Sequence, residues 1–240
     1  MAAKRAAKPS PAAPGPLEPC PDCNGSGYLI DGMDAVRCPC GTALGEETRR
    51  RLAAAEIPAR YRDKSFGNFR AASPAHRAVR DTAMSWAESY HPVESQGLIL
   101  KGGTGCGKTH LALAILRVVV EHGHTGLYVN FSDLLTRLRE TYGDASAETE
   151  AEVLGKVNTP ELVVLDDLGA ENTTDWVRDR LYLIINRRYE SQRSVVLTTN
   201  CTIAELDQRL GKRTVSRLFE MCPFQFPDFP EGDWRRANMK

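Results

Sequence analysis

From residue 97 onwards the chain alternates between short apolar runs and longer segments in which apolar residues recur at helical spacing. Four runs are nearly continuous in apolar residues, as strands buried on both faces of a parallel sheet are, and they lie at 97–101, 126–131, 162–167 and 194–200. The segment 108–121 shows the helical repeat, with Leu111, Ile115 and Val119 on one face. Strands that alternate with helices predict an α/β fold in which helices flank a parallel sheet.

Capping residues and prolines predict where the other helices begin and end. Residues 46–57 look helical up to Pro58, and Ser73 ahead of Pro74 is typical of the start of a helix, here one that runs to about residue 90. Ser132 is expected to cap the helix that follows the second strand. One further helix is expected to end near residue 157. Three more are expected at 174–191, 202–210 and 212–221. Residues 222–240, rich in proline and aromatic residues, show no regular pattern.

A phosphate-binding motif lies between the first strand and the helix that follows it. The eight residues GGTGCGKT match G-x-x-x-x-G-K-[ST] in full and have the strand and helix that this motif needs. The glycines let successive backbone N–H groups turn toward a phosphate, and the helix N-terminus adds its positive dipole end. Lys108 is expected to contact the β- and γ-phosphates, and the Thr109 hydroxyl to bind Mg²⁺. The nucleotide is expected to touch Gly102, Gly103, Thr104, Gly105, Cys106, Gly107, Lys108 and Thr109.

Two acids end the third predicted strand. Asp166 and Asp167 follow the buried run LVVL directly, which would deliver a carboxylate to the metal beside the P-loop. We expect Asp166 to be the Mg²⁺ partner, directly or through water, and Asp167 to polarise the water that attacks the phosphate. The alternative is that both acids only end the strand.

The order of these motifs resembles the AAA+ ATPases. After the P-loop and the acidic strand comes an apolar strand that ends in Asn200, and Arg213 and Arg217 follow it. The resemblance implies ATP as the nucleotide, an ATPase reaction, and Asn200 as a residue that helps to position the attacking water. The chain departs from the usual AAA+ pattern at the second acid, since many members have glutamate where this chain has Asp167. An ATP-binding adaptor with incidental hydrolysis therefore stays an alternative.

Three stretches resemble, more narrowly, the DnaC/DnaI-type replicative helicase loaders and their IstB-type relatives. They lie at 57–69, 162–189 and 211–222, and the resemblance spans about residues 20–222. It implies a DNA replication protein that binds a hexameric replicative DNA helicase and single-stranded DNA, and that self-associates with ATP into a ring or spiral. Arg217 matches the loaders' arginine finger, and Arg213 matches its companion. An IstB-type transposition helper, which shares the ATPase core, is the alternative.

The same resemblance implies two further groups of contact residues. An aromatic lid over the adenine would come from Arg60, Tyr61, Phe66 and Phe69. Ordinary packing against the sheet edge is the alternative for these residues. A mixture of cations and an aromatic ring suits single-stranded DNA, and it is found at Arg137, Arg139, Tyr142 and Lys156. A solvated helix face is the alternative for that second group.

Four of the seven cysteines form two close pairs near the start of the chain. Two pairs on a short, loop-rich stretch can surround one Zn²⁺ as a closed structural site, whose ligands would be Cys20, Cys23, Cys38 and Cys40. Free thiols and an iron–sulfur cluster are the alternatives. The first pair also resembles one repeat of the DnaJ cysteine-rich module, which a single repeat cannot build. Similar N-terminal modules in DnaI-like loaders imply that this end engages the helicase.

Composition and charge set the remaining expectations. The chain has 31 Lys+Arg and 31 Asp+Glu, so any contact with nucleic acid must come from a local patch. The sequence shows neither a secretory signal nor an apolar run long enough to span a membrane, and we expect a cytoplasmic protein without a membrane partner. Its expected parts are a disordered tail at 1–19, the zinc module and linker helix at 20–57, an AAA+ ATPase domain at 58–222 and a C-terminal tail at 223–240.

Overall fold

The computed structural model describes residues 28–31, 34–37, 46–94, 96–143, 147–170, 173–222, 224–225, 229–230 and 232. The chain divides into two compact units, Met1–Arg49 and Arg50–Lys240. In the first unit β1 (Tyr28–Asp31) pairs antiparallel with β2 (Asp34–Arg37). The tail predicted at 1–19 and the four predicted zinc ligands lie outside the described residues. Within the described residues, none of the helices is both long and apolar enough to cross a membrane.

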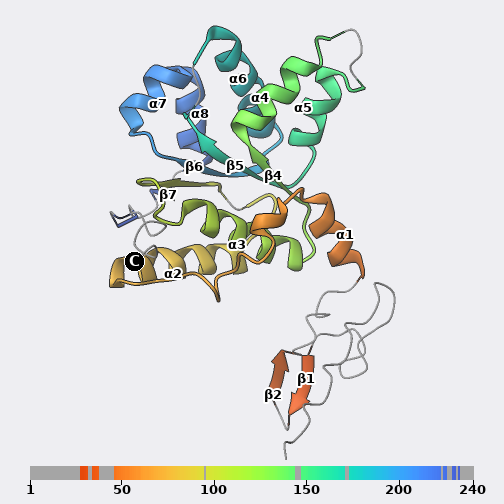
Figure 1. Ribbon diagram of the computed structural model, residues 1–240, viewed down its shortest axis with the longest axis vertical. Helices are drawn as coiled ribbons and strands as arrows, with labels where there is room; N and C mark the ends of the chain where they lie inside the picture. The colour runs from red at the N-terminus through yellow and green to blue at the C-terminus, as the bar shows by residue number, and fades with distance from the viewer. Residues whose placement is uncertain are drawn as a thin grey trace, which may run out of the picture. The chain divides into compact units, whose positions relative to one another are not determined.

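The second unit is built on a five-stranded parallel sheet with the order β4-β5-β6-β3-β7 (Figure 1). Its strands are β3 (Leu98–Lys101), β4 (Gly126–Asn130), β5 (Leu162–Leu168), β6 (Ser194–Thr199) and β7 (Phe224–Gln225). The first four agree with the predicted strands to within a residue or two. The fifth was missed, because a two-residue strand is too short to show any alternation in the sequence.

Helices alternate with the strands β3, β4, β5 and β6 along the chain. They are α1 (Glu46–Ala54), α2 (Pro74–Glu88), α3 (Lys108–Glu121), α4 (Phe131–Glu140), α5 (Glu150–Asn158), α6 (Asp175–Glu190), α7 (Ile203–Leu210) and α8 (Lys212–Met221), with a short 3₁₀ turn η1 (Ala59–Tyr61). Ser73 caps α2 as predicted. The predicted Ser132 cap was wrong. Asn130 caps α4, because β4 ends there in an extended conformation and its side-chain oxygen accepts from the N–H of Asp133.

The helices cover the two faces of the sheet. Figure 1 shows α2 and α3 on one face and α4 to α8 on the other. The strand pattern explains the two buried clusters that result, since alternate residues of one strand point to opposite faces. Leu162 and Val164 of β5 belong to the cluster with α2 and α3, whereas Val163 and Leu165 belong to the cluster with α4 to α8.

Arg188 of α6 is a fully buried structural cation. Its guanidinium donates to four backbone carbonyls, those of Val157 at 3.1 Å, Pro160 at 3.0 Å, Glu161 at 2.9 Å and Ser194 at 2.6 Å. Burial lowers the pKa of Arg188 to about 9, which leaves it charged at neutral pH. The residue therefore ties the end of α5 and the start of β5 to the start of β6.

Candidate nucleotide site

The P-loop takes a backbone conformation that only glycine adopts without strain. Gly105 and Gly107 have φ values of 77° and 106°. Gly107 directly precedes α3, and a Cβ atom there would lie 2.7 Å from Cε2 of Phe69. The motif glycine is therefore required by the backbone conformation and by the ring packed against it.

Lys108 is buried, with 7% of its surface exposed, and it is held by neutral oxygens. Its Nζ donates to the carbonyl oxygens of Gly102 at 2.9 Å and Gly103 at 2.7 Å. A third hydrogen bond goes to Oδ1 of Asn200 at 2.7 Å. An ammonium has three N–H donors, so these acceptors fix its position while its charge is not neutralised by them. The end of β6 thus meets the P-loop at this lysine.

Asp166 is also buried, and three hydroxyl groups donate hydrogen bonds to its carboxylate. Thr109 donates to its two oxygens at 2.9 and 3.2 Å, Thr198 to Oδ1 at 2.6 Å, and Tyr128 to Oδ2 at 2.8 Å. Burial and the Asp166 charge raise the pKa of Tyr128 far above its usual value, so this phenol stays a donor. A buried carboxylate needs such donors, and Asp166 has them on both oxygens.

Asp167 points the other way because the strand bulges. The register between β5 and β6 shifts between Leu165 and Leu168, and Asp167 has a positive φ of 64°. A bulge re-aims the side chains around it, and here Asp166 is buried while Asp167 is exposed. The backbone N–H of Asp167 donates to Oγ1 of Thr198 at 2.8 Å. Nδ2 of Asn200 lies 3.3 Å from its carboxylate, so the Asn200 amide bridges Lys108 and Asp167.

The residues brought together fit a magnesium nucleotide. Mg²⁺ prefers oxygen ligands and uses one or two carboxylates beside phosphate oxygens, and the Thr109 hydroxyl and Asp166 carboxylate are in contact. Lys108 supplies the uncompensated positive charge next to them. The structure therefore joins five sequence-predicted residues in one cluster: Lys108, Thr109, Asp166, Asp167 and Asn200.

The aromatic residues ahead of the first strand of the sheet pack in the core. Phe66 and Phe69 are 9% and 8% exposed and belong to the cluster with α2 and α3. The Phe69 ring lies edge-on to His110 at 5.3 Å, and Nε2 of His110 lies 2.9 Å from the carbonyl of Ser65. For these two phenylalanines the contacts are those of the packing alternative. Of the two, Phe69 packs against the P-loop at Gly107.

A family comparison decides what kind of protein carries this cluster. Residues 46–219 match the family described as IstB-like ATP binding protein, which is more than half of the chain. The chain belongs to the IstB-like ATP-binding protein family.

Individual relatives of this IstB-like chain agree with the match. The replicative helicase loader DnaC of Buchnera aphidicola subsp. Schizaphis graminum is 28% identical over 158 residues, which is 66% of this chain and 64% of that relative's length. A crystal structure of the DnaC helicase loader is 30% identical, with a TM-score of 0.63, over 69% of this chain and 97% of the other. A DnaI crystal structure at 24% identity and a TM-score of 0.60, over 70% of this chain and 92% of the other, shares the fold. The resemblance to DnaC/DnaI-type AAA+ proteins is thereby confirmed.

In this IstB-like chain the two late arginines, Arg213 and Arg217, contact tyrosines of α6. Both stack on Tyr182 of α6, Arg213 at 4.9 Å and Arg217 at 4.8 Å from the ring centre. Arg213 also donates to the Tyr182 hydroxyl at 2.8 Å, and Arg217 lies 5.5 Å from the ring centre of Tyr189. The described contacts of these arginines are with α6, and none of them joins Lys108 or Asp166.

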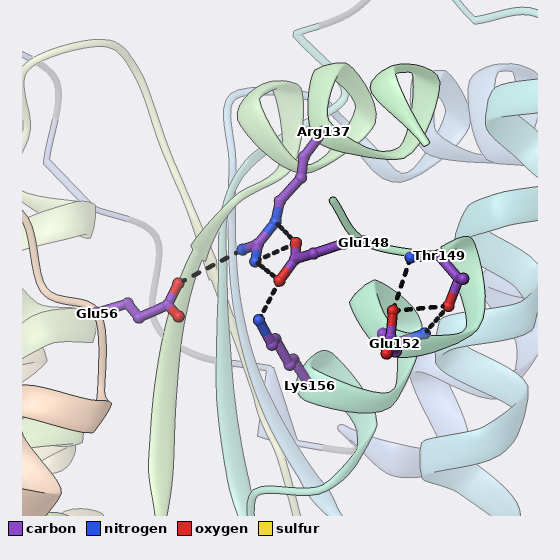
Figure 2. Close-up of polar contacts among 6 residues, drawn as sticks. All are labelled: Glu56, Arg137, Glu148, Thr149, Glu152 and Lys156. Carbon is purple, nitrogen blue, oxygen red and sulfur yellow. Dashed lines mark hydrogen bonds and ion pairs between the residues drawn. The ribbon is translucent and has the colours of Figure 1, made fainter. Parts of the chain in front are cut away.

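Two of the four residues expected at DNA are used inside the chain. Figure 2 shows Arg137 of α4 and Lys156 of α5 converging on Glu148. Nε of Arg137 lies 2.8 Å from the Glu148 carboxylate. The Arg137 guanidinium also lies 3.9 Å from the Glu56 carboxylate. The hydrogen bonds from Lys156 and Arg137 lower the pKa of Glu148. These two cations form an intramolecular ion-pair network, which we call the Glu148 network.

The other two residues, Arg139 and Tyr142, belong to a cation–aromatic cluster in which both are exposed. Tyr142 is 56% exposed, and its hydroxyl accepts from Nε1 of Trp176 at 3.3 Å. Arg139 lies 5.1 Å and Arg180 5.9 Å from the Trp176 ring centre. The Glu150 carboxylate pairs with Arg180 and accepts from the Tyr142 hydroxyl at 2.7 Å. We call Arg139, Tyr142, Trp176 and Arg180 the Trp176 cluster. Trp176 and Arg180 were missed in the sequence because helical spacing alone does not show that α6 lies beside the end of α4.

Three residues at the nucleotide site were also missed. Tyr128 and Thr198 looked like ordinary strand residues, yet both contact Asp166. Phe229 is buried against the P-loop, where a Cβ atom on Gly102 would lie 2.8 Å from its Cβ. A polar hydroxyl at an otherwise apolar strand position was the available signal for Tyr128 and Thr198. No pattern pointed to Phe229, since it lies in the segment expected to lack regular structure.

Proposed function

We propose that the protein is an ATP-dependent loader of a replicative DNA helicase. The observation that carries this proposal is a complete phosphate-binding cluster in a chain 30% identical to a DnaC helicase loader structure. The match spans under two thirds of the DnaC relatives' own length, so the activity and partners of the whole loader are inferences for this chain. A cytoplasmic location remains the prediction from the sequence.

The cluster supports hydrolysis of ATP. Lys108 and the N-terminal N–H groups of α3 would bind the phosphates, and Thr109 and Asp166 would hold Mg²⁺. The metal would neutralise charge on the phosphate oxygens. Asp167 would accept a proton from the attacking water, and the Asn200 amide, 3.3 Å from Asp167, would orient that water toward the phosphate next to Lys108.

Arg217 is proposed to act on a neighbouring copy. In its own chain it lies on Tyr182 and Tyr189, on the surface made by α6 and α8. An arginine held there can stabilise charge on a phosphate of an adjacent subunit in a ring or spiral, with Arg213 beside it. An Arg217→Ala variant should keep ATP affinity and lose hydrolysis. Mixing it with a Lys108→Met variant should then restore some hydrolysis, because each mutant subunit supplies what the other lacks. Mixed samples that stay inactive would contradict a role in trans.

Single-stranded DNA is proposed to bind at the Trp176 cluster. The exposed Tyr142 phenol and the half-buried Trp176 indole offer stacking surfaces, and the exposed Arg139 guanidinium offers a phosphate contact. Arg180 is paired with Glu150 and supports the Trp176 ring. Stacking on one ring contributes about 1–3 kcal/mol per base, so Trp176→Ala should weaken binding of oligothymidine roughly tenfold. Arg137→Ala, in the Glu148 network, is the matched control and should bind as the wild type does. Fluorescence anisotropy at two salt concentrations measures both.

We propose that the N-terminal cysteine module binds the helicase, and this binding gives the test of the proposed function. Native mass measurements of the protein with its host's hexameric helicase, with and without ATP, should give a stoichiometric complex. A Cys20→Ser/Cys23→Ser variant should lose that complex and its bound zinc. If no complex forms in any nucleotide state while ATP drives assemblies on DNA, the loader proposal fails. An IstB-type transposition helper would then replace it.

A further inference from the structure

Tyr128 stands on the outermost strand of the described sheet, yet its side chain reaches the centre of the nucleotide site. It lies on β4, where it is paired with Val164 of β5, while Asn130 is paired with Asp166. Its ring is 6% exposed, and its hydroxyl donates to Oδ2 of Asp166 at 2.8 Å. This edge strand thus sends one hydroxyl to the acid proposed to hold the metal.

The hydroxyls around Asp166 divide its two oxygens between them. Thr198 donates to Oδ1 at 2.6 Å and Tyr128 to Oδ2 at 2.8 Å, while Thr109 of the P-loop approaches both oxygens. Rotation of the carboxylate about its Cβ–Cγ bond would break the bond to Thr198 or to Tyr128. These two residues therefore fix the plane of the carboxylate, and its edge faces Thr109.

Tyr128 is itself held in place from the other side. Its backbone N–H donates to the carbonyl of Ala55 at 2.8 Å, just after α1. Its ring meets the Tyr61 ring edge-on, with 6.4 Å between the ring centres. A hydroxyl on a ring that is fixed in this way is preorganised, and it needs no reordering when a ligand arrives.

We propose that Tyr128 is a positioning residue for the magnesium ion, acting through Asp166; the proposal rests on the Mg-ATP site described under the proposed function. Tyr128 does not touch the metal. It sets the orientation in which the carboxylate meets the ion and the Thr109 hydroxyl. Loss of such an outer partner typically lowers metal affinity about 10–100-fold.

The test measures how strongly Mg²⁺ improves nucleotide binding by the full chain. The Kd for a non-hydrolysable ATP analogue is determined in EDTA and over a Mg²⁺ titration, for wild type and Tyr128→Phe. The ratio of metal-free to metal-saturated Kd should fall about tenfold in the variant, with the metal-free Kd within twofold of wild type. This readout does not depend on turnover. Thermal unfolding confirms that the variant folds, as the ring is retained.

Tyr90→Phe is the matched control. Tyr90 is another buried tyrosine, and its ring packs against His124, just past the far end of α3 from the P-loop. The Tyr90→Phe substitution should leave the metal-free and the metal-saturated Kd unchanged. An unchanged ratio in Tyr128→Phe would overturn the positioning role, and so would an equal loss with and without metal, which would mean a general effect on the P-loop. A wild-type protein without any metal effect would instead overturn the proposed Mg-ATP site itself.

Discussion

Two sets of cations in the described part of the chain are held in opposite ways. Lys108 is 7% exposed and donates to three neutral oxygens at the carboxyl edge of the sheet. Arg137 and Lys156 are more exposed, and both donate to the carboxylate of Glu148 (Figure 2). A buried cation among neutral acceptors keeps its charge for a ligand, whereas an exposed cation paired with a carboxylate is largely neutralised. The number of basic residues in a segment therefore says less about ligands than the acceptors that surround them.

The largest expected effect would come from the exposed acid at the bulge. Asp167→Asn keeps the shape of the side chain, and asparagine tolerates the positive φ of 64°, so the backbone should not change. Hydrolysis should fall about a hundredfold or more because the general base is lost, while ATP binding is retained. Steady-state phosphate release, with calorimetry for binding, measures both. Glu148→Gln, the same change in the Glu148 network, should alter hydrolysis less than twofold. Equal rates for Asp167→Asn and wild type would mean that this acid only ends the strand.

Arg188 sharpens the comparison, because it too is buried among neutral oxygens. It differs from Lys108 in being 0% exposed and in donating to four carbonyls. Its charge holds the fold together. Arg188→Met would leave these carbonyls without a donor and should lower the free energy of unfolding by about 3 kcal/mol or more. Urea denaturation measures the loss. Stability equal to wild type would show that water replaces the guanidinium.

The smallest effect is expected in the Glu148 network. Glu148→Gln should lower the unfolding temperature only slightly at pH 7, and less in high salt. Folding lowers the pKa of Glu148, so its stabilising contribution is present above the unfolded pKa and is lost as the pH falls through the folded value. The unfolding temperatures of variant and wild type should approach each other as the pH falls below the ordinary glutamate pKa. A difference that does not shrink on acidification would mean that the network stabilises the fold by something other than charge.

The sequence predicted the contiguous parts of the molecule well. Four strands follow from apolar runs, and the P-loop follows from one motif whose glycines at 105 and 107 have positive φ in the structure. The contact of Lys108 with Asn200 agrees with what the AAA+ resemblance implied, and parallel strands that end at one edge of the sheet make it possible. These predictions rest on local periodicity and on topology that a parallel sheet imposes.

Contacts set by the packing of distant segments could not be predicted. Tyr128 and Thr198 look like strand residues until the register brings them to Asp166. The basic residues Arg137 and Lys156 were expected at DNA, and only the position of Glu148 on the intervening loop shows that they are paired. Whether a cation is paired with a carboxylate depends on side chains that are distant in the sequence. Helical or strand spacing does not predict this pairing.

The most direct test of this account compares two lysines under one substitution. Calorimetric titration of ATP with Mg²⁺ should give the same Kd for wild type and Lys156→Met. Lys108→Met should weaken binding at least about a hundredfold, since a charge-assisted contact to phosphate is lost in a buried site. If Lys108→Met binds ATP as tightly as Lys156→Met does, the uncompensated lysine is not the phosphate ligand, and the central claim is wrong.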